Sequence, residues 1–173
     1  MKKNEKEFVC LNFSIFVISD TRNERSDKSG KLLQDKISSY GHKVLNKEFV
    51  IDDFDLIKIA LKKGIDNPSI DIIILTGGTG LTGRDSTPEA VKSLINREIP
   101  GFGEMFRYIS FEKIGTSSLQ SRALGGVAGD TFIFSLPGSP GACSDAWEEI
   151  LKHQLDIRTK PCNLVELIPR LKE

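Results

Sequence analysis

The apolar run IDIIIL at residues 70–75 is followed without a break by the glycine-rich stretch TGGTGLTGRDSTPEA at residues 76–90. A short apolar run without alternation is typical of a strand buried on both faces, as in a parallel sheet covered by helices. Glycines directly after such a strand predict a tight loop at its carboxyl end, the edge where open α/β sheets bind ligands. This pair of features favours an α/β fold with a site at one edge.

The rest of the chain alternates strand and helix signals in the same way. We expect strands at 11–19 and 42–51, and helices at 28–41, 52–65, 87–96, 100–115 and 139–155. Residues 122–138 contain two strand-like runs around the turn dipeptide Gly129-Asp130, which predicts a hairpin. The pattern therefore predicts a three-layer α/β/α fold, with a mostly parallel sheet and an antiparallel edge hairpin.

Length and charge limit what else the chain is expected to be. With 173 residues, we expect a single domain over 1–173, with a charged arm at 1–8 and an irregular tail at 156–173 that lies against a partner surface. Net charge is zero, so the field needed for nonspecific binding to nucleic acid or an anionic membrane is absent. Any anion must therefore be bound locally.

The N-terminus and the cysteines predict a cytoplasmic protein. Residues 1–8 are charged and lack a signal-peptide pattern, and no window approaches the roughly 20 apolar residues of a membrane span. The three cysteines, Cys10, Cys143 and Cys162, are odd in number and widely spaced, which favours reduced thiols. We expect no metal site built from them.

Two named nucleotide motifs fit the glycine stretch only in part. Gly78, Gly80 and Gly83 satisfy G-x-G-x-x-G, but the helix start signal comes later, at Thr87-Pro88, and the acid expected about 20 residues on is missing. A phosphate-binding P-loop would need a lysine and a hydroxyl where Arg84 and Asp85 stand. Both motifs are disfavoured.

A simpler interpretation is that the glycine loop binds an anion without belonging to either named motif. Backbone N–H groups of the glycine loop, with the hydroxyl groups of Thr76, Thr79, Ser86 and Thr87, are suited to binding an anion. The alternative is a tight loop that needs glycine only for its positive φ angles. The segment FIFSLPGSPGA has the same pattern, an apolar strand followed by a loop with Gly138 and a helix start at Ser139. The expected ligand therefore carries more than one anionic group.

Acidic residues at the same edge predict a divalent metal. Asp85 lies in the glycine loop, and Asp52 and Asp53 end the second strand, so Mg²⁺ held by carboxylates and substrate phosphates is expected. For Asp52 and Asp53 the alternative is a helix N-cap with a first-turn acid.

Several other polar residues have more than one interpretation. The loop at 19–30 contains Ser19, Asp20 and Arg22 and is long enough to close over a ligand; the alternative is a solvated loop with Asp27 as a helix cap. The polar run at 116–126 predicts a turn, His42 and His153 are expected at the surface, and Trp147 is expected in the core.

Taken together and in order, these segments resemble the family of molybdenum cofactor biosynthesis protein B and molybdopterin adenylyltransferase. The matching stretches cover nearly the whole chain: ISDTR, DDFDLI, ILTGGTGLTGRDSTPEA, GFGEMFR, LQSRA, LPGSPGA and QLDIRTKPCN. The stretches GTSSLQSRA and RTKPCN are more similar to the B-type branch.

The resemblance implies a molybdopterin-binding fold that assembles into trimers or hexamers. It implies that the phosphate of molybdopterin lies on the loop of Thr76, Gly77, Gly78, Thr79 and Gly80, and that Mg²⁺-ATP adenylylates this phosphate. The two aspartates that matter in the adenylyltransferase branch correspond to Asp52 and Asp85, and the loop serine corresponds to Ser121. The alternative within the same family is a noncatalytic pterin-binding or scaffolding oligomer.

Overall fold

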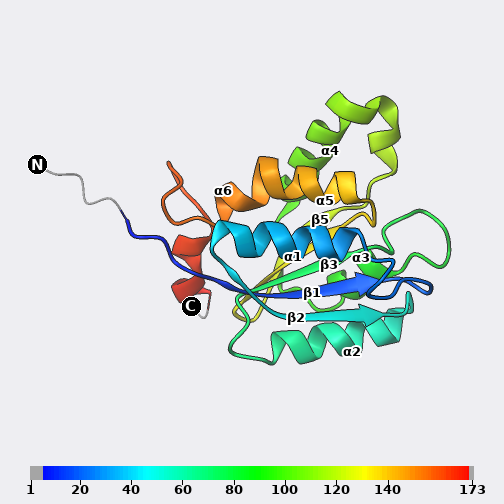
Figure 1. Ribbon diagram of the computed structural model, residues 1–173, viewed down its shortest axis with the longest axis horizontal. Helices are drawn as coiled ribbons and strands as arrows, with labels where there is room; N and C mark the ends of the chain where they lie inside the picture. Colours follow the sequence, from blue (N-terminus) through cyan, green and yellow to red (C-terminus); the bar gives the residue numbers. More distant parts are fainter. Residues whose placement is uncertain (1–5, 172–173) are drawn as a thin grey trace, which may run out of the picture.

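The computed structural model describes residues 6–171 and contains one mixed sheet between two layers of helices (Figure 1). Its strands are β1 (Asn12–Ile18), β2 (Lys43–Val50), β3 (Ile72–Thr76), β4 (Arg97–Glu98), β5 (Leu124–Ala128) and β6 (Thr131–Leu136). The order across the sheet is β2-β1-β3-β6-β5-β4. Strands β2, β1, β3 and β6 run parallel, whereas β5 and β4 form an antiparallel edge. The predicted fold class and the hairpin at Gly129-Asp130 are confirmed.

Helices cover both faces of the sheet, as its continuous apolar strands require. The helices are α1 (Ser29–Tyr40), α2 (Phe54–Ile65), α3 (Thr87–Lys92), α4 (Pro100–Ile114), α5 (Pro140–Ala146) and α6 (Lys152–Gln154). A π-helical segment, η2 (Trp147–Leu151), joins α5 to α6, so residues 140–154 form one continuous helical segment. The expected closing helix at 139–155 is therefore confirmed.

Alternate residues of each central strand enter two separate cores. Ile72 and Ile74 of β3 pack with α1, α4 and the closing helical segment, and Trp147 lies in this core as expected. Ile73 and Leu75 pack on the other face with α2 and α3. The sheet is held from both sides, and the carboxyl ends of β1, β2, β3 and β6 are fixed along one edge.

The helix expected at 87–96 is shorter than predicted. It ends at Lys92, because the chain turns into the sheet: Asn96 donates its backbone N–H to Val127 O at 2.7 Å, and β4 follows. A two-residue strand carries no periodicity, so β4 could not be predicted from the sequence. The six residues Gly115–Gln120 form a 3₁₀ helix, η1, that was also not predicted.

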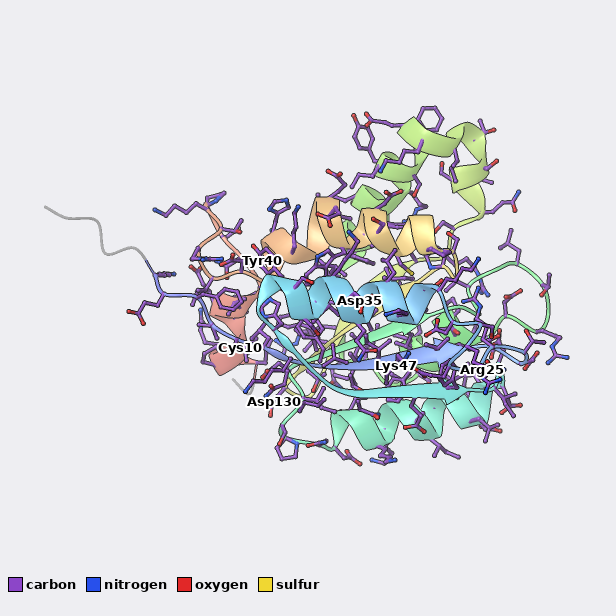
Figure 2. All side chains as sticks on the ribbon, in the orientation of Figure 1. Cys10, Arg25, Asp35, Tyr40, Lys47 and Asp130 are labelled. Carbon is purple, nitrogen blue, oxygen red and sulfur yellow. The ribbon has the colours of Figure 1, made fainter. Side chains whose placement is uncertain are left out.

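His42 corrects the prediction of two surface histidines, since only His153 is exposed. The His42 side chain is 4% exposed and lies among the rings of Phe8, Phe13, Tyr40 and Trp147 (Tyr40 is labelled in Figure 2). Leu11 donates its backbone N–H to His42 Nδ1 at 3.1 Å. Gly41 ends α1 with φ of 108°, and this turn directs His42 inward.

The tail packs on the core of its own chain through residue 171. It contains one 3₁₀ helix, η3 (Val165–Arg170), and Arg97 Nη2 donates to Leu171 O at 3.1 Å. Lys6 forms an ion pair with Glu166, so the described part of the predicted arm crosses this tail. Residues 1–5 of the arm and residues 172–173 of the tail lie outside the described residues.

Candidate functional site

A cavity of about 560 Å³ lies at the carboxyl edge of the parallel strands. It brings together most residues that the sequence predicted for the site: Ser19, Gly77, Gly78, Thr79, Gly80, Asp85, Ser121, Gly138 and Ser139. The two glycine-bearing loops converge there, because β3 and β6 are neighbours in the sheet. A further cavity, between α3 and α4, shares Ser121 but contains neither loop.

The glycine loop needs its first two glycines for backbone geometry. Gly77 and Gly78 have φ angles of 109° and 63°, and a Cβ at Gly77 would lie 2.1 Å from Ile18 O. The alternative interpretation, that glycine serves positive φ angles, is thus correct for these two residues. It does not exclude anion binding: the backbone N–H groups of Gly78 and Thr79 donate to no acceptor within residues 6–171, and both residues line the cavity.

Thr76 is not brought into the cavity with the rest of the loop. Its side chain is fully buried, and Oγ1 donates to Pro137 O at 3.0 Å and lies 3.2 Å from Cys143 Sγ. The hydroxyl of Thr76 therefore connects the glycine loop to the second loop from inside the core. Burial raises the pKa of the Cys143 thiol to about 11, so this cysteine stays protonated.

Asp52 stands beside the glycine loop, and Asp53 does not. Asp52 Oδ1 accepts from the backbone N–H of Ser86 at 3.2 Å, and Asp52 Oδ2 lies 2.7 Å from where a Cβ of Gly78 would be. Asp53 instead caps α2, since its Oδ1 accepts from Asp55 N at 3.0 Å and Leu56 N at 3.1 Å. The N-cap alternative is therefore confirmed for Asp53, whereas the metal-binding role expected for Asp52 stays a prediction.

Asp85 belongs to the loop itself. Its Oδ2 accepts from the hydroxyl of Thr82 and, at 3.2 Å, from the Thr82 backbone N–H. The Thr82 hydroxyl, with backbone N–H groups of Gly80 and Thr82 and the charge of Arg122, lowers the pKa of Asp85. Asp85 is thus a carboxylate near neutral pH.

Negative charge gathers around Asp52. Burial raises its pKa most, the hydrogen bonds from Ser86 lower it, and the neighbouring Asp85 and Asp20 raise it further. Asp20 accepts from Asp52 N at 3.3 Å and forms an ion pair with Arg84, so it contacts Asp52 but does not line the cavity. A cation among these carboxylates would relieve their repulsion.

The described residues do not form a metal site by themselves. Within 6–171 no group of three or more histidine, cysteine, aspartate or glutamate side chains is placed to hold a metal ion. Mg²⁺, however, is usually bound through one or two carboxylates together with waters and substrate phosphates. The pair Asp52 and Asp85 fits that arrangement.

Two serines of the site have fixed neighbours. Ser19 Oγ accepts from the backbone N–H groups of Thr21 at 3.3 Å and Arg22 at 3.1 Å, which turns the loop after β1. Ser139 caps α5, its Oγ accepting from Ala142 N at 3.2 Å. Each hydroxyl keeps its own proton for donation toward the cavity that it lines.

Arg122 is a structural contributor that the sequence left among turn residues. Its Nη2 donates to Asp85 O at 2.7 Å, its Nε donates to Thr79 O at 3.4 Å, and it forms an ion pair with Glu89. One side chain, two residues before β5, thus holds the glycine loop, the Asp85 segment and α3. Its place next to Ser121 in LQSRA was the available signal.

Comparison with known proteins identifies the family of this chain. The family described as "Probable molybdopterin binding domain" matches residues 14–157. Molybdenum cofactor biosynthesis protein B of Escherichia coli (strain K12) is 45% identical over 163 residues, which are 94% of this chain and 96% of that protein.

Solved structures are similar over the same length. A crystal structure of molybdenum cofactor biosynthesis protein B has a TM-score of 0.82 at 38% identity, covering 96% of both chains. The tungsten cofactor synthesizing protein MoaB from Pyrococcus furiosus has a TM-score of 0.78 at 31% identity, covering 95% of this chain and 98% of that chain. The chain therefore belongs to the molybdenum cofactor biosynthesis protein B family.

Proposed function

We propose that this protein binds molybdopterin, with its phosphate on the loop Gly77–Gly80, and transfers the adenylyl group of Mg²⁺-ATP to that phosphate. The observation that carries the proposal is the contact of two carboxylates with this loop. A Cβ at Gly78 would lie 2.7 Å from Asp52 Oδ2, and one at Gly80 would lie 2.8 Å from Asp85 Oδ2. Asp85 lines the cavity with the anion donors of the loop, and Asp52 does not line it but lies beside Gly78, which does.

The proposed reaction forms one P–O bond and breaks another. An oxygen of the pterin phosphate attacks the α-phosphorus of ATP, the bond to the β-phosphate breaks, and pyrophosphate leaves. A phosphate monoester is largely doubly charged near neutral pH, so its attacking oxygen needs no strong base. The residues of the chain would position the two phosphates for this attack.

Asp52 and Asp85 are the residues that would hold the metal ion. Mg²⁺ bound there would neutralise charge on the reacting phosphates and on the leaving pyrophosphate. Ser139 and Gly138 are suited to a second anionic group, and Ser121, which lines the same cavity, is suited to binding the ligand. Asp20 acts through its contact with Asp52, and Thr76 through its bond to Pro137.

The proposal is tested by mixing the protein, Mg²⁺-ATP and molybdopterin and measuring pyrophosphate release. Omission of any one component should abolish the release. Asp85→Asn should lower the turnover roughly a hundredfold to a thousandfold, while pterin affinity changes by less than about threefold, because the lost charge matters most in the transition state. Binding of molybdopterin without any release by the unaltered protein would exclude adenylylation.

A second candidate function is a noncatalytic, pterin-binding or scaffolding oligomer of the same pathway. The observation that favours it is an apolar surface on α4 and η1, whose side chains are exposed: Met105, Tyr108, Phe111, Ile114 and Leu119. An exposed apolar row of this kind marks an interaction surface. The scaffold predicts pterin binding that Asp52→Asn leaves unchanged, and no turnover.

In either case we propose a homo-oligomer, a trimer or hexamer, that contacts its copies through this apolar surface of α4. We also propose a cytoplasmic location, supported by the three free cysteines. Among residues 6–171 the structure contains no helix that is long and apolar enough to cross a membrane. With zero net charge, the absence of nucleic-acid binding stays a prediction.

A further inference from the structure

One of the two terminal nitrogens of the Arg22 guanidinium donates no hydrogen bond to the described residues. Its Nη2 donates to Gly138 O at 2.7 Å, which fixes the guanidinium against the second loop of the site. Its Nη1 is buried and has no hydrogen-bond partner among the described residues. A buried N–H group without an acceptor is costly, so this atom calls for a partner that binds there.

The position of Arg22 points to a ligand of the cavity. The residue lines the cavity, and a Cβ at Gly138 would lie 3.4 Å from Arg22 Nη1 and 3.3 Å from Gly77 Cα. Arg22 Nη1 therefore lies where the glycine loop and the second loop meet. The backbone N–H groups of Gly78 and Thr79, also without acceptors within 6–171, line the same cavity.

The charge of Arg22 is not balanced by a nearby carboxylate. None of the ion pairs within residues 6–171 includes Arg22, whereas Arg84, Arg122 and Arg158 each pair with an acid. The acids of its own loop have other partners: Asp20 pairs with Arg84, and Glu24 and Asp27 pair with Lys47 at 2.7 Å and 3.3 Å. A cation in this setting favours an anionic ligand.

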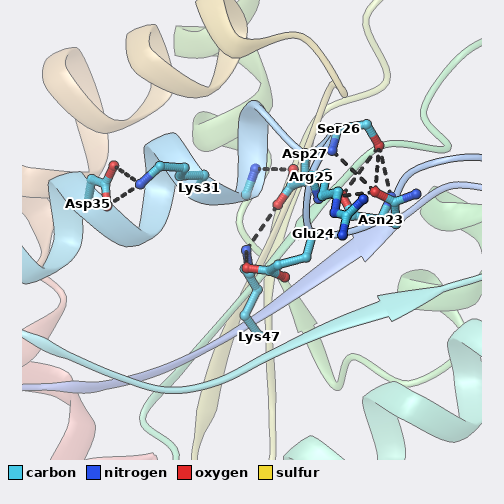
Figure 3. A network of polar contacts seen from close by, with 9 residues as sticks. Asn23, Glu24, Arg25, Ser26, Asp27, Lys31, Asp35 and Lys47 are labelled. Carbon is cyan, nitrogen blue, oxygen red and sulfur yellow. Dashed lines mark hydrogen bonds and ion pairs between the residues drawn. The ribbon is translucent and has the colours of Figure 1, made fainter.

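The loop that carries Arg22 is held in place before any ligand arrives (Figure 3). Asn23 and Ser26 close a turn, since Ser26 N donates to Asn23 O at 3.0 Å and Asn23 N donates to Ser26 Oγ at 3.0 Å. Asp27, only 3% exposed, accepts from Gly30 N at 2.8 Å and pairs with Lys47. Less conformational entropy is then lost when Arg22 binds its ligand.

We propose that Arg22 is a substrate-binding residue whose Nη1 donates to the phosphate group received by the glycine loop, and that it makes the cavity selective for a phosphate. The assignment rests on the proposed function for the identity of the phosphate carrier, molybdopterin. The arrangement of the hydrogen-bond donors supports binding of a phosphate group, whatever molecule carries it. Free backbone N–H groups and a fixed guanidinium suit an anion with several acceptor oxygens.

The test compares Arg22→Gln with Arg25→Gln, which removes the same charge from an exposed position three residues along the same loop. Inorganic phosphate and molybdopterin are each titrated into the unaltered protein and both variants by calorimetry. Arg22→Gln should weaken the binding of inorganic phosphate and of molybdopterin roughly tenfold to a hundredfold, as expected for a charge-assisted hydrogen bond. Arg25→Gln should weaken either by less than about threefold.

A second variant covers the case in which Arg22→Gln does not fold, as checked by its thermal unfolding. Arg22→Lys keeps the charge but has no planar fork, so its single ammonium group cannot keep both directed contacts of the guanidinium. Intermediate weakening of phosphate binding is expected. Full affinity in a folded Arg22→Gln, or equal loss in Arg22→Gln and Arg25→Gln, would overturn the assignment. Where Arg22→Gln does not fold, full affinity in Arg22→Lys would overturn it.

The two ligands separate this assignment from the proposed function. If inorganic phosphate binds and depends on Arg22 but molybdopterin does not bind, the pterin function fails and the phosphate site stands. If molybdopterin binds with no dependence on Arg22, the assignment of Arg22 fails and the pterin-binding function stands. An unaltered protein that binds neither inorganic phosphate nor molybdopterin would overturn both.

Discussion

Asp52 and Ser86 are joined by two hydrogen bonds, since Asp52 Oδ1 accepts from the Ser86 backbone N–H at 3.2 Å and from its hydroxyl at 3.3 Å. These bonds connect the end of β2 to the start of α3 across the glycine loop. One oxygen of Asp52 is thereby held by the chain, while the other lies beside Gly78. The carboxylate is oriented before a substrate binds, which the proposed chemistry requires.

The adjacent aspartates allow a matched comparison. Asp52→Asn should lower the rate of pyrophosphate release roughly a hundredfold or more, because it removes a charge that holds the metal and the transition state. Asp53→Asn should keep a rate within about threefold of the unaltered protein, since asparagine caps a helix as well as aspartate does. The measurement is the turnover with Mg²⁺-ATP and molybdopterin at saturation. Equal loss in both variants would show that Asp52 has no special role.

Gly78 is expected to be irreplaceable for steric reasons. In Gly78→Ala the added methyl group would lie 2.3 Å from Thr87 Oγ1 and 2.7 Å from Asp52 Oδ2, at a φ of 63°. We expect a loss of about 1–3 kcal/mol in the free energy of unfolding, measured by urea denaturation, and a displaced Asp52. Gly83→Ala is the control: nothing lies within 4 Å of its added Cβ. A change there beyond about 0.5 kcal/mol would question this steric argument.

The sequence was most informative where a strand ends in a loop of fixed chemistry. The apolar run at 70–75 predicted β3 and the edge that holds the cavity, because apolar periodicity and glycine act locally. The second loop at Gly138 and Ser139 followed from the same rule. Their convergence was predictable, since parallel neighbours end at a common edge.

What the sequence did not resolve depends on contacts between distant residues. Asp52 and Asp53 look alike in the sequence, and only the position of Ser86, more than thirty residues away, separates the site residue from the cap. The hydroxyl of Thr76 is directed inward by Pro137, and His42 is buried by rings from four segments. No local pattern encodes such contacts.

Burial of His42 should make the protein less stable in mild acid. Burial lowers the pKa of His42 from 6.5 to about 4, so the unfolded chain binds a proton at a higher pH than the folded one. The contribution of neutral His42 to the free energy of unfolding is fully present above about pH 6.5. It is lost as the pH falls from 6.5 to about 4, and this difference in pKa corresponds to about 3 kcal/mol. Urea unfolding at several pH values between 7 and 4 measures this slope.

Two variants separate this effect from other acid titrations. His42→Gln should lower the stability at pH 7 and remove most of the slope between pH 6.5 and 4.5, whereas His153→Gln, on an exposed residue, should keep it. Carboxylates with a lowered pKa, such as Glu148 at about 2, contribute only below about pH 4.5. A slope that persists in His42→Gln would assign the acid sensitivity to another group.

The apolar surface of α4 should decide the assembly state. Phe102 and Phe106 anchor the first turns of α4 in the core, while Tyr108, Phe111 and Ile114 of its later turns are 67%, 55% and 58% exposed. In Figure 1 this end of α4 stands away from the sheet. Phe111→Asp should therefore convert a trimer or hexamer to smaller species, because a charge would be buried in the interface without a partner. Light scattering after size exclusion measures the mass.

Ile59→Asp provides the matched control, because Ile59 is 65% exposed on α2, which packs on the opposite face of the sheet. The Ile59→Asp variant should have the same mass in solution as the unaltered protein. Thermal unfolding of both variants separates dissociation from misfolding, since Phe111→Asp changes an exposed side chain of the single chain. A monomeric unaltered protein, or dissociation by Ile59→Asp and not by Phe111→Asp, would exclude the α4 surface as the contact between copies.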